Sequence, residues 1–226
     1  MFRKGLVMVL TMASWGCGSE PQGADIDRPA LMDPKSPAMN EEAPDEYKAE
    51  FVTTKGTFVV EVTREWAPIG ADRFYNLVKR GYYNGCALFR VIPGFVVQFG
   101  ISGDPEIGAK WSGHPQINPN YKDVTLQDEP VKQSNTPGML TYAKGGPNSR
   151  TTQVFVNLGN NSRNLDGKGF PPFGKVVDGL DVLKGLHSGY GEGVSHKQGE
   201  IMKKGNAYLK EKFPKLDYIE RARIID

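Results

Sequence analysis

An arginine, a phenylalanine and a glutamine lie close together in the segment FRVIPGFVVQ, residues 89–98. Arg90 precedes a Pro-Gly turn, while Phe95 and Gln98 follow it, and the runs on both sides are rich in β-branched and aromatic residues. In the second run Val96 and Gln98 would share one face of a strand, because strand side chains alternate with a period of two. A fixed guanidinium beside apolar side chains could stabilise a transition state by hydrogen bonding alone.

Two later segments could add to the same surface. A glycine-rich turn leads into Gln153 and Phe155, which would share one face of a strand. The segment NLDGKGFPPFG, residues 164–174, places Leu165 on a turn. Taken singly, Phe95, Phe155 and Leu165 are better explained as ordinary core positions, so their significance depends on their occurring together.

The sequence lacks the motifs of the common catalytic machineries, namely GxSxG, the P-loop, GxGxxG after a strand, and HExxH. The histidines His114, His187 and His196 do not have the spacing of metal ligands, and we therefore expect no metal site and no cofactor. Cys86 is far from any histidine in the sequence and is predicted to be a small buried filler. An enzyme made from this sequence would have to work without a nucleophile, a metal or a general base.

Short strands separated by turns must position these residues. Alternating residues predict a hairpin over 47–63 around Lys55 and Gly56. Further strands are predicted at 88–92, 95–99, 139–143, 153–158, 173–177 and 218–225. Helices are predicted at 67–81, 178–186 and about 199–212. The regular strand spacing favours a closed barrel capped by helices. Residues 102–137 are rich in Pro, Gly, Asn and Asp, and they are predicted to form a long loop with a functional role.

Together, the motifs FRVIPGFVVQ, GPNSRTTQVFV and LDGKGFPPFGKVVDGLDVL resemble the cyclophilin family of peptidyl-prolyl isomerases, in which they occur in the same order. The resemblance covers about residues 47–225. It implies a mainly β fold, an eight-stranded antiparallel closed β-barrel capped by two helices, to which this chain adds an extra C-terminal helix. It also implies catalysis of rotation about X–Pro peptide bonds, a reaction in which no covalent bond breaks.

The resemblance assigns roles to individual positions. Arg90 and Gln98 are expected to be catalytic, with Gln98 beside the substrate backbone. The residues expected to bind substrate are Phe95, Val96, Ala143, Gln153, Phe155 and Leu165.

Four residues depart from the family pattern. Lys144 stands where many relatives have Asn, and Asn164 replaces the Trp that accompanies cyclosporin binding in eukaryotic relatives. Gly169 and Phe170 stand where a pocket His is common. We therefore expect weak cyclosporin sensitivity and a different outer rim of the pocket, with the centre at Arg90 unchanged.

The first residues are typical of an export signal. A short cationic opening precedes the uncharged apolar stretch 5–13, which is too short to span a bilayer. Gly16 and Cys17 then resemble the lipobox of bacterial lipoproteins, in which the cysteine is acylated. Gly18 favours the outer membrane by the same resemblance. We expect residues 1–16 to be a signal peptide, and a plain secretory signal with a chance cysteine is the alternative.

Charge and composition divide the rest of the chain. Residues 18–46 carry eight acidic residues, two basic residues and five prolines, and we expect 17–46 to be a lipidated cysteine followed by a disordered acidic linker. The domain at 47–226 is only mildly basic, which argues against nucleic acid as a partner. With 38% hydrophobic residues in 226, the chain can form one sizeable core, and no run of 18 apolar residues predicts a permanent membrane span.

The sequence thus predicts an exported, membrane-tethered prolyl isomerase that faces the periplasm, and we expect it to be a monomer. Its partners would be proline-containing segments of unfolded or partly folded proteins, whose folding it would assist. One alternative is a proline-peptide-binding or chaperone module with little turnover. Another is a lipid- or ligand-carrying barrel, against which the polar Arg and Gln residues count.

Overall fold

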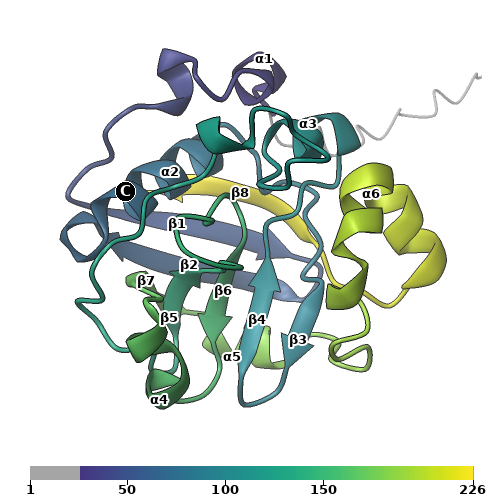
Figure 1. Ribbon diagram of the computed structural model, residues 1–226. Coiled ribbons are helices and arrows are strands. Elements are labelled where there is room, and N and C mark those ends of the chain that lie inside the picture. The colour runs from purple at the N-terminus through teal and green to yellow at the C-terminus, as the bar shows by residue number, and fades with distance from the viewer. Residues whose placement is uncertain (1–25, 226) are drawn as a thin grey trace, which may run out of the picture.

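The computed structural model describes residues 26–225, and within them eight strands form one antiparallel sheet (Figure 1). The strands are β1 Glu46–Thr53, β2 Gly56–Thr63, β3 Arg90–Ile92, β4 Val96–Phe99, β5 Met139–Tyr142, β6 Val154–Asn157, β7 Pro172–Asp178 and β8 Ile219–Ile225. Their order across the sheet is β3-β4-β6-β5-β7-β2-β1-β8. The predicted hairpin is β1–β2, in which Thr53 pairs with Gly56. The mainly β, eight-stranded antiparallel fold is therefore confirmed.

The two edge strands, β3 and β8, meet just before each of them begins. Ala87 and Tyr218 form an isolated antiparallel bridge there. The Leu88 amide donates to the Asp217 carbonyl at 2.9 Å, and the Ile219 amide donates to the Cys86 carbonyl at the same distance. The sheet thus curls into a barrel that is closed by a short bridge and not by a full ladder of hydrogen bonds. The outer backbone edge of β3 is therefore left without a paired strand among residues 26–225.

Helices cover the barrel. Those in the described residues are α1 Arg28–Met32, α2 Pro68–Lys79, α3 Pro105–Lys110, α4 Ser162–Leu165, α5 Leu180–Lys184 and α6 Gln198–Lys212. Helix α2 packs against β7 and β8, and α5 packs against β2, which gives the two predicted caps. Helix α6 is the predicted extra helix and lies beside the β3–β4 edge (Figure 1). No helix among residues 26–225 is long and apolar enough to cross a membrane.

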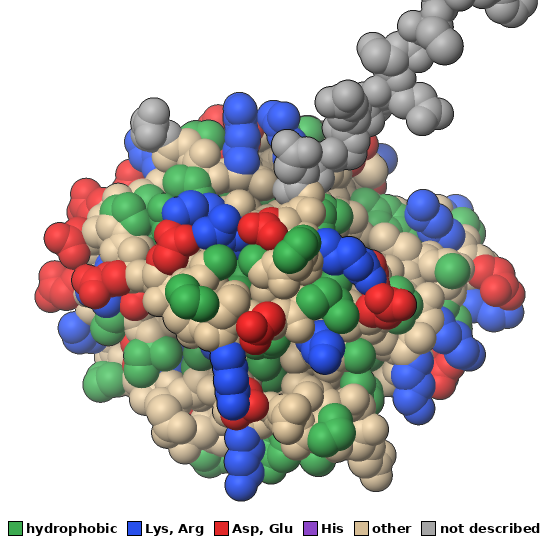
Figure 2. Space-filling model, turned by 90° about the horizontal axis from the view of Figure 1, so that it is seen from above, with side chains coloured by type: hydrophobic (Ala, Val, Ile, Leu, Met, Phe, Trp, Pro, Cys, Tyr) green, Lys and Arg blue, Asp and Glu red, His purple; other side chains and the backbone are tan. Residues whose placement is uncertain are grey.

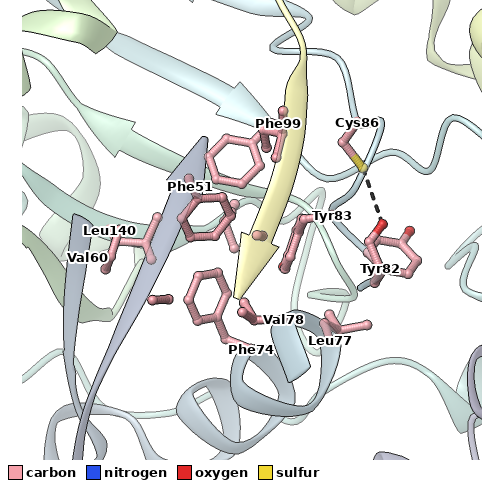
Figure 3. Close-up of a cluster of buried hydrophobic side chains, with 14 of the residues drawn as sticks. Phe51, Val60, Phe74, Leu77, Val78, Tyr82, Tyr83, Cys86, Phe99 and Leu140 are labelled. Carbon is pink, nitrogen blue, oxygen red and sulfur yellow. Dashed lines mark hydrogen bonds between the residues drawn. The ribbon is translucent and has the colours of Figure 1, made fainter. Parts of the chain in front are cut away.

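The barrel interior is filled by aromatic rings from strands and from α2. Phe51 stacks on Phe58 with ring centroids 4.9 Å apart, and it also lies within 6.0 Å of Phe74 and Tyr83 (Figure 3). Cys86 is fully buried and its thiol donates to the Tyr82 carbonyl at 3.6 Å. The predicted role of this cysteine as a buried filler is therefore confirmed.

The prediction of a disordered linker up to residue 46 is wrong for residues 26–46, which pack on the domain. Leu31 and Met39 are buried in the main core, and the Trp111 indole donates to the Leu31 carbonyl at 2.8 Å. The segment contains too few apolar residues for a core of its own, but it needs none because it docks on one that already exists. The predicted signal peptide at 1–16, Cys17 and the rest of the linker lie outside the described residues.

The acidic residues of this segment are paired with cations of the domain. Glu41 binds both Lys79, at 2.5 Å, and Arg80. Glu42 lies 3.4 Å from the Arg64 guanidinium. Positive and negative side chains accordingly alternate over the face that carries α1 and α3 (Figure 2). The charge contrast that suggested a separate tether is in part an interface between this segment and the domain.

The predicted long loop at 102–137 also has more structure than expected. Asp104 caps α3 by accepting the amides of Glu106 and Ile107, at 2.8 and 3.3 Å. Ile107 and Trp111 then enter the core and are 3% and 1% exposed. A cap followed by two apolar residues four positions apart is a helix signal, but the surrounding Pro, Gly and Asn residues obscure it in the sequence.

Helix α6 and the segment before it rest on a second hydrophobic cluster. Its members are Ala87, Phe89, Ile101, Val194, Ile201, Leu209 and Leu216. The helix is interrupted at Gly205, whose φ of 59° and ψ of −150° are not helical. A Cβ at this position would lie 2.3 Å from the Gly103 carbonyl oxygen. Only glycine allows α6 to approach the backbone at Gly103 so closely.

Candidate active site

The strand register aligns three of the predicted site residues in one row. Arg90 on β3 pairs with Gln98 on β4, and Gln98 pairs with Phe155 on β6. Their neighbours Val97 and Val156 belong to the barrel core. Because side chains alternate along a strand, Arg90, Gln98 and Phe155 must point to the outer face of the barrel. Val96 lies on the same face of β4 as Gln98.

A chain of hydrogen bonds runs from the arginine across this face. Arg90 Nη1 donates to Gln98 Oε1 at 3.1 Å, and Gln98 Nε2 donates to Gln153 Oε1 at 2.9 Å. Gln153 Nε2 then donates to Gln198 Oε1 at 2.9 Å. Gln98 and Gln153 each accept from one neighbour and donate to the next, so the chain fixes the orientation of both amides.

Phe95 lies against the arginine, and Val96 and Phe155 share the outer face of the sheet with it. The Arg90 guanidinium carbon lies 5.3 Å from the centre of the Phe95 ring. Phe95 itself is held in a turn, since its amide donates to the Ile92 carbonyl at 2.9 Å. Val96 and Phe155 are 1% and 5% exposed, although neither belongs to the main core cluster. They form an apolar floor on the outer face.

Ala143 and Leu165 are brought to this face through backbone bonds. The Ala143 amide donates to the Gln153 carbonyl at 2.9 Å, which extends the β5–β6 pairing by one residue. Leu165 ends α4, where its amide donates to the Asn161 carbonyl at 3.0 Å. Asn161 Nδ2 in turn donates to the Phe95 carbonyl at 2.9 Å. The turns that carry Leu165 and Phe95 are thus tied together.

A buried polar network supports these turns. Asn135 is fully buried and donates through its amide and its side chain to Asp166, at 2.9 and 2.8 Å. It also donates to the Phe170 carbonyl at 2.9 Å and accepts from Thr141 at 2.9 Å. Burial tends to raise the pKa of Asp166, but the hydrogen bonds from Asn135 and Ser134 outweigh it and lower the pKa. The carboxylate therefore stays ionised and holds the network in place.

Phe170 and Lys144, two of the positions that depart from the family pattern, join this surface. The Phe170 ring packs edge-on against Phe155, with centroids 6.1 Å apart. The Lys144 ammonium lies 5.5 Å from the Phe170 ring centre and 3.3 Å from Asp128. Phe170 therefore extends the apolar wall. In the sequence this residue was recognised only as a departure from the family pattern.

Two residues of the site were not predicted at all. Glu192 accepts from Arg90 Nε at 2.8 Å and from Arg90 Nη2 at 2.6 Å, and Gln198 ends the amide chain. Glu192 lies in the segment that leads into α6, 102 positions from Arg90, and Gln198 is the first residue of α6. The hydrogen bonds from Arg90 are the main cause that lowers the pKa of Glu192. No spacing rule connects residues so far apart in the sequence.

The site offers hydrogen-bond donors and an apolar wall. Among the described residues, no group of three His, Cys, Asp or Glu side chains is placed to hold a metal ion. Burial raises the pKa of the Cys86 thiol to about 12, so this cysteine is not a nucleophile at neutral pH. The arrangement can bind a small ring and polarise a carbonyl beside it.

Comparison with known proteins agrees with this arrangement. Residues 48–206 match the model of the cyclophilin-type peptidyl-prolyl cis-trans isomerase/CLD family. A peptidyl-prolyl cis-trans isomerase of Schizosaccharomyces pombe is 37% identical over 135 residues, which are 60% of this chain and 81% of that protein. Peptidyl-prolyl cis-trans isomerase-like 3 of Homo sapiens is 34% identical over 134 residues, 59% of this chain and 78% of that protein. These relatives are eukaryotic, so the predicted bacterial export signal has no support from them.

The fold also has a solved counterpart. The crystal structure of a cyclophilin-type peptidyl-prolyl cis-trans isomerase of Cryptosporidium parvum superposes with a TM-score of 0.57 at 19% sequence identity. It covers 80% of this chain and 98% of its own. Since the family model spans most of the barrel, and the barrel carries Arg90 and its apolar wall on one face, this chain belongs to the cyclophilin-type peptidyl-prolyl cis-trans isomerases and catalyses rotation about X–Pro bonds.

Proposed function

We propose that Arg90 is the catalytic residue of this isomerase and that the proline ring binds against Phe95, Val96, Phe155 and Leu165. The observation that carries this proposal is the Arg90 guanidinium, which lies against the Phe95 ring and is fixed by Gln98. Gln98, Gln153 and the backbone at Ala143 would then align the peptide. A related structure of the Cryptosporidium parvum enzyme was determined in the presence of the dipeptide Ala-Pro, which supports a proline-containing substrate.

The height of the rotation barrier supports a mechanism in which the protein only donates hydrogen bonds. Rotation about a peptide bond faces a barrier of about 18–20 kcal/mol because the amide is conjugated. At the upper value the uncatalysed rate is roughly 0.01 per second. A typical turnover of about 10 per second requires a barrier lower by about 4 kcal/mol. One preorganised donor in a site shielded from water contributes about 2.7–4 kcal/mol. A single fixed guanidinium could therefore supply most of the rate, and no proton has to be transferred.

The electronic reason is the loss of conjugation. In the twisted transition state the prolyl nitrogen no longer shares its lone pair with the carbonyl, so it becomes more basic and pyramidal. A guanidinium that donates to the carbonyl oxygen of the proline residue holds the backbone in the geometry that favours this state. The apolar wall holds the ring while the preceding carbonyl rotates. Lysine in place of Arg90 would keep the charge but lose the planar pair of donors.

The proposal is tested by replacing Arg90. We expect Arg90→Ala to lower kcat/KM on an X–Pro peptide at least tenfold, with Arg90→Lys between it and the wild type, while circular dichroism stays unchanged. Arg223→Ala is the matched control, since Arg223 is also a strand arginine paired with a carboxylate, Glu50, at 2.7 Å. A folded Arg90→Ala protein with full activity would refute the catalytic role.

The same measurements separate turnover from simple binding. A proline-peptide-binding module would retain peptide affinity and show little acceleration even in the wild type. Peptide binding measured by titration, alongside isomerisation, therefore decides between the enzyme and the alternative module.

We further propose that the protein is exported and tethered to a membrane through a lipid on Cys17, facing the periplasm from the outer membrane. The cationic opening, the apolar stretch 5–13 and the Gly16-Cys17-Gly18 sequence support this. Its clients would be proline-containing segments of unfolded or partly folded exported proteins, on which it would act as a monomer. Mass spectrometry of the membrane-extracted N-terminus tests the proposal, because a plain secretory signal would leave no acyl group.

A further inference from the structure

The segment before α6, together with the first residue of α6, contacts both ends of the polar chain in the active site. We call residues 192–198 the clip. At one end Glu192 binds Arg90 through two hydrogen bonds, and at the other end Gln198 accepts from Gln153. The clip ends on Gln198, which is the first residue of α6.

The clip is held in place by hydrophobic packing and by local hydrogen bonds. Val194 is fully buried in the second hydrophobic cluster, which also contains Phe89, the residue before Arg90. Ser195 Oγ lies 2.8 Å from both the backbone carbonyl and the carboxylate of Glu192. The position of the Glu192 carboxylate is thus set by packing and by a local hydrogen bond. An ordinary surface ion pair, in contrast, joins two freely moving side chains and contributes little.

The geometry of the ion pair leaves part of the guanidinium available. A guanidinium has five N–H donors. Glu192 takes one from Nε and one from Nη2, which is the bidentate arrangement of arginine with a carboxylate. Gln98 takes one from Nη1. Two donors, one on each terminal nitrogen, have no partner among the described residues. Both remain available to a carbonyl oxygen that approaches the guanidinium.

We propose that Glu192 is a positioning residue for catalysis: it fixes the plane of the Arg90 guanidinium so that the two remaining N–H donors face the substrate carbonyl. This inference rests on the proposed catalytic role of Arg90. Three hydrogen bonds from two opposite sides restrict rotation of the side chain, which is only 22% exposed. Such preorganisation lowers the cost of reaching the reactive geometry. Without Glu192, Gln98 alone would hold the guanidinium, and its plane could rotate.

The test compares Glu192→Gln and Glu192→Ala with Glu200→Gln. Glu200 is a matched control, because it is a carboxylate on α6 that pairs with Lys204 at 2.6 Å, and the pair lies outside the polar chain. We expect Glu192→Ala to lower kcat on an X–Pro peptide about tenfold with KM little changed. Glu192→Gln, which can accept only one of the two bonds, should fall between. Thermal unfolding should be unchanged in all three.

Nuclear magnetic resonance of the Arg90 Nε–H group gives a second readout. In the wild type this proton should exchange slowly and resonate apart from those of exposed arginines, and both properties should be lost in Glu192→Ala. Unchanged activity in Glu192→Ala would overturn the proposal. Increased activity would also overturn it, because it would mean that Glu192 blocks the donors.

A double variant separates this inference from the role of Arg90 itself. In an Arg90→Ala background, Glu192→Ala should cause no further loss, since Glu192 acts only through the guanidinium. An additional loss there would overturn the positioning role. If Arg90→Ala alone kept full activity, the proposed catalytic role of Arg90 would fail. That measurement uses a protein in which Glu192 is intact, so the two failures can be told apart.

Discussion

A buried ion pair connects the loop that leads to Gln153 with the start of α2, and breaking it offers a quantitative test of the structure. Arg150 has a fully buried side chain, and its Nη1 lies 2.8 Å from Oε2 of Glu129. Its Nη2 donates to the Gln127 carbonyl. Glu129 also accepts the first amides of α2, from Ile69 at 2.7 Å and from Gly70 at 3.1 Å.

The perturbation is Arg150→Met, which keeps much of the volume and removes the charge. Loss of one partner leaves the Glu129 carboxylate buried without a countercharge, which costs about 3–5 kcal/mol. The two amides of α2 still donate to that carboxylate, so we expect about 3 kcal/mol, the lower end of the range. The double variant Glu129→Gln/Arg150→Met carries neither charge of this pair and should be more stable than Arg150→Met alone.

The assay is urea unfolding followed by circular dichroism, with the slope compared between variants to confirm that the same surface is exposed. Lys184→Met serves as a control, because Lys184 pairs with Asp181 at the surface, where such pairs contribute little. An Arg150→Met cost below about 1 kcal/mol would refute the reasoning, and so would a double variant less stable than the single one.

Two other predictions concern α6 and the buried thiol. Gly205→Ala should destabilise the docking of α6 by about 2 kcal/mol or more, because the new Cβ would lie 2.3 Å from the Gly103 carbonyl oxygen. Hydrogen exchange of the α6 amides measures this loss, and Gly199→Ala is the control because a Cβ at Gly199 would meet nothing within 4 Å among the described residues. Equal protection of α6 in both variants would contradict the prediction. In a Cys17→Ser chain, Cys86 should resist a thiol reagent at pH 8 until the protein unfolds, since burial raises its pKa to about 12, and rapid labelling of the native protein would contradict its burial. Because the thiol ionises at lower pH in the unfolded chain, its contribution to stability should be lost as the pH rises above about 8.5.

Local patterns were sufficient for the hairpin and for the strand face on which Val96 and Gln98 lie. The period-two alternation around Lys55 and Gly56 predicted the β1–β2 hairpin with its turn in the right place. The same alternation placed Val96 and Gln98 on one strand face, away from Val97 in the core. These features depend on residues close together in the chain, and steric and hydrophobic constraints of that range are visible in one sequence.

Local patterns failed where a segment is ordered by a distant surface. Residues 26–46 have the composition of a disordered linker, yet Leu31 and Met39 occupy hollows in a core formed by other elements. The amino-acid composition of a segment indicates whether the segment can form a core of its own. It does not indicate whether the segment can pack into a core that other elements form. For the same reason the segment 102–137 was predicted as loop, although Trp111 anchors it.

The sequence by itself determined which side chains could act. These are Arg90 with Gln98 on adjacent strands, and the apolar residues of the three motifs that occur in the same order as in the family. Only the tertiary structure decided what holds the arginine in place. Glu192 comes from a segment 102 positions away, and its approach depends on Val194 being buried beside Phe89. Hydrogen bonds act over about 3 Å in space whatever the separation along the chain, so the partner of a side chain is determined by how the elements pack.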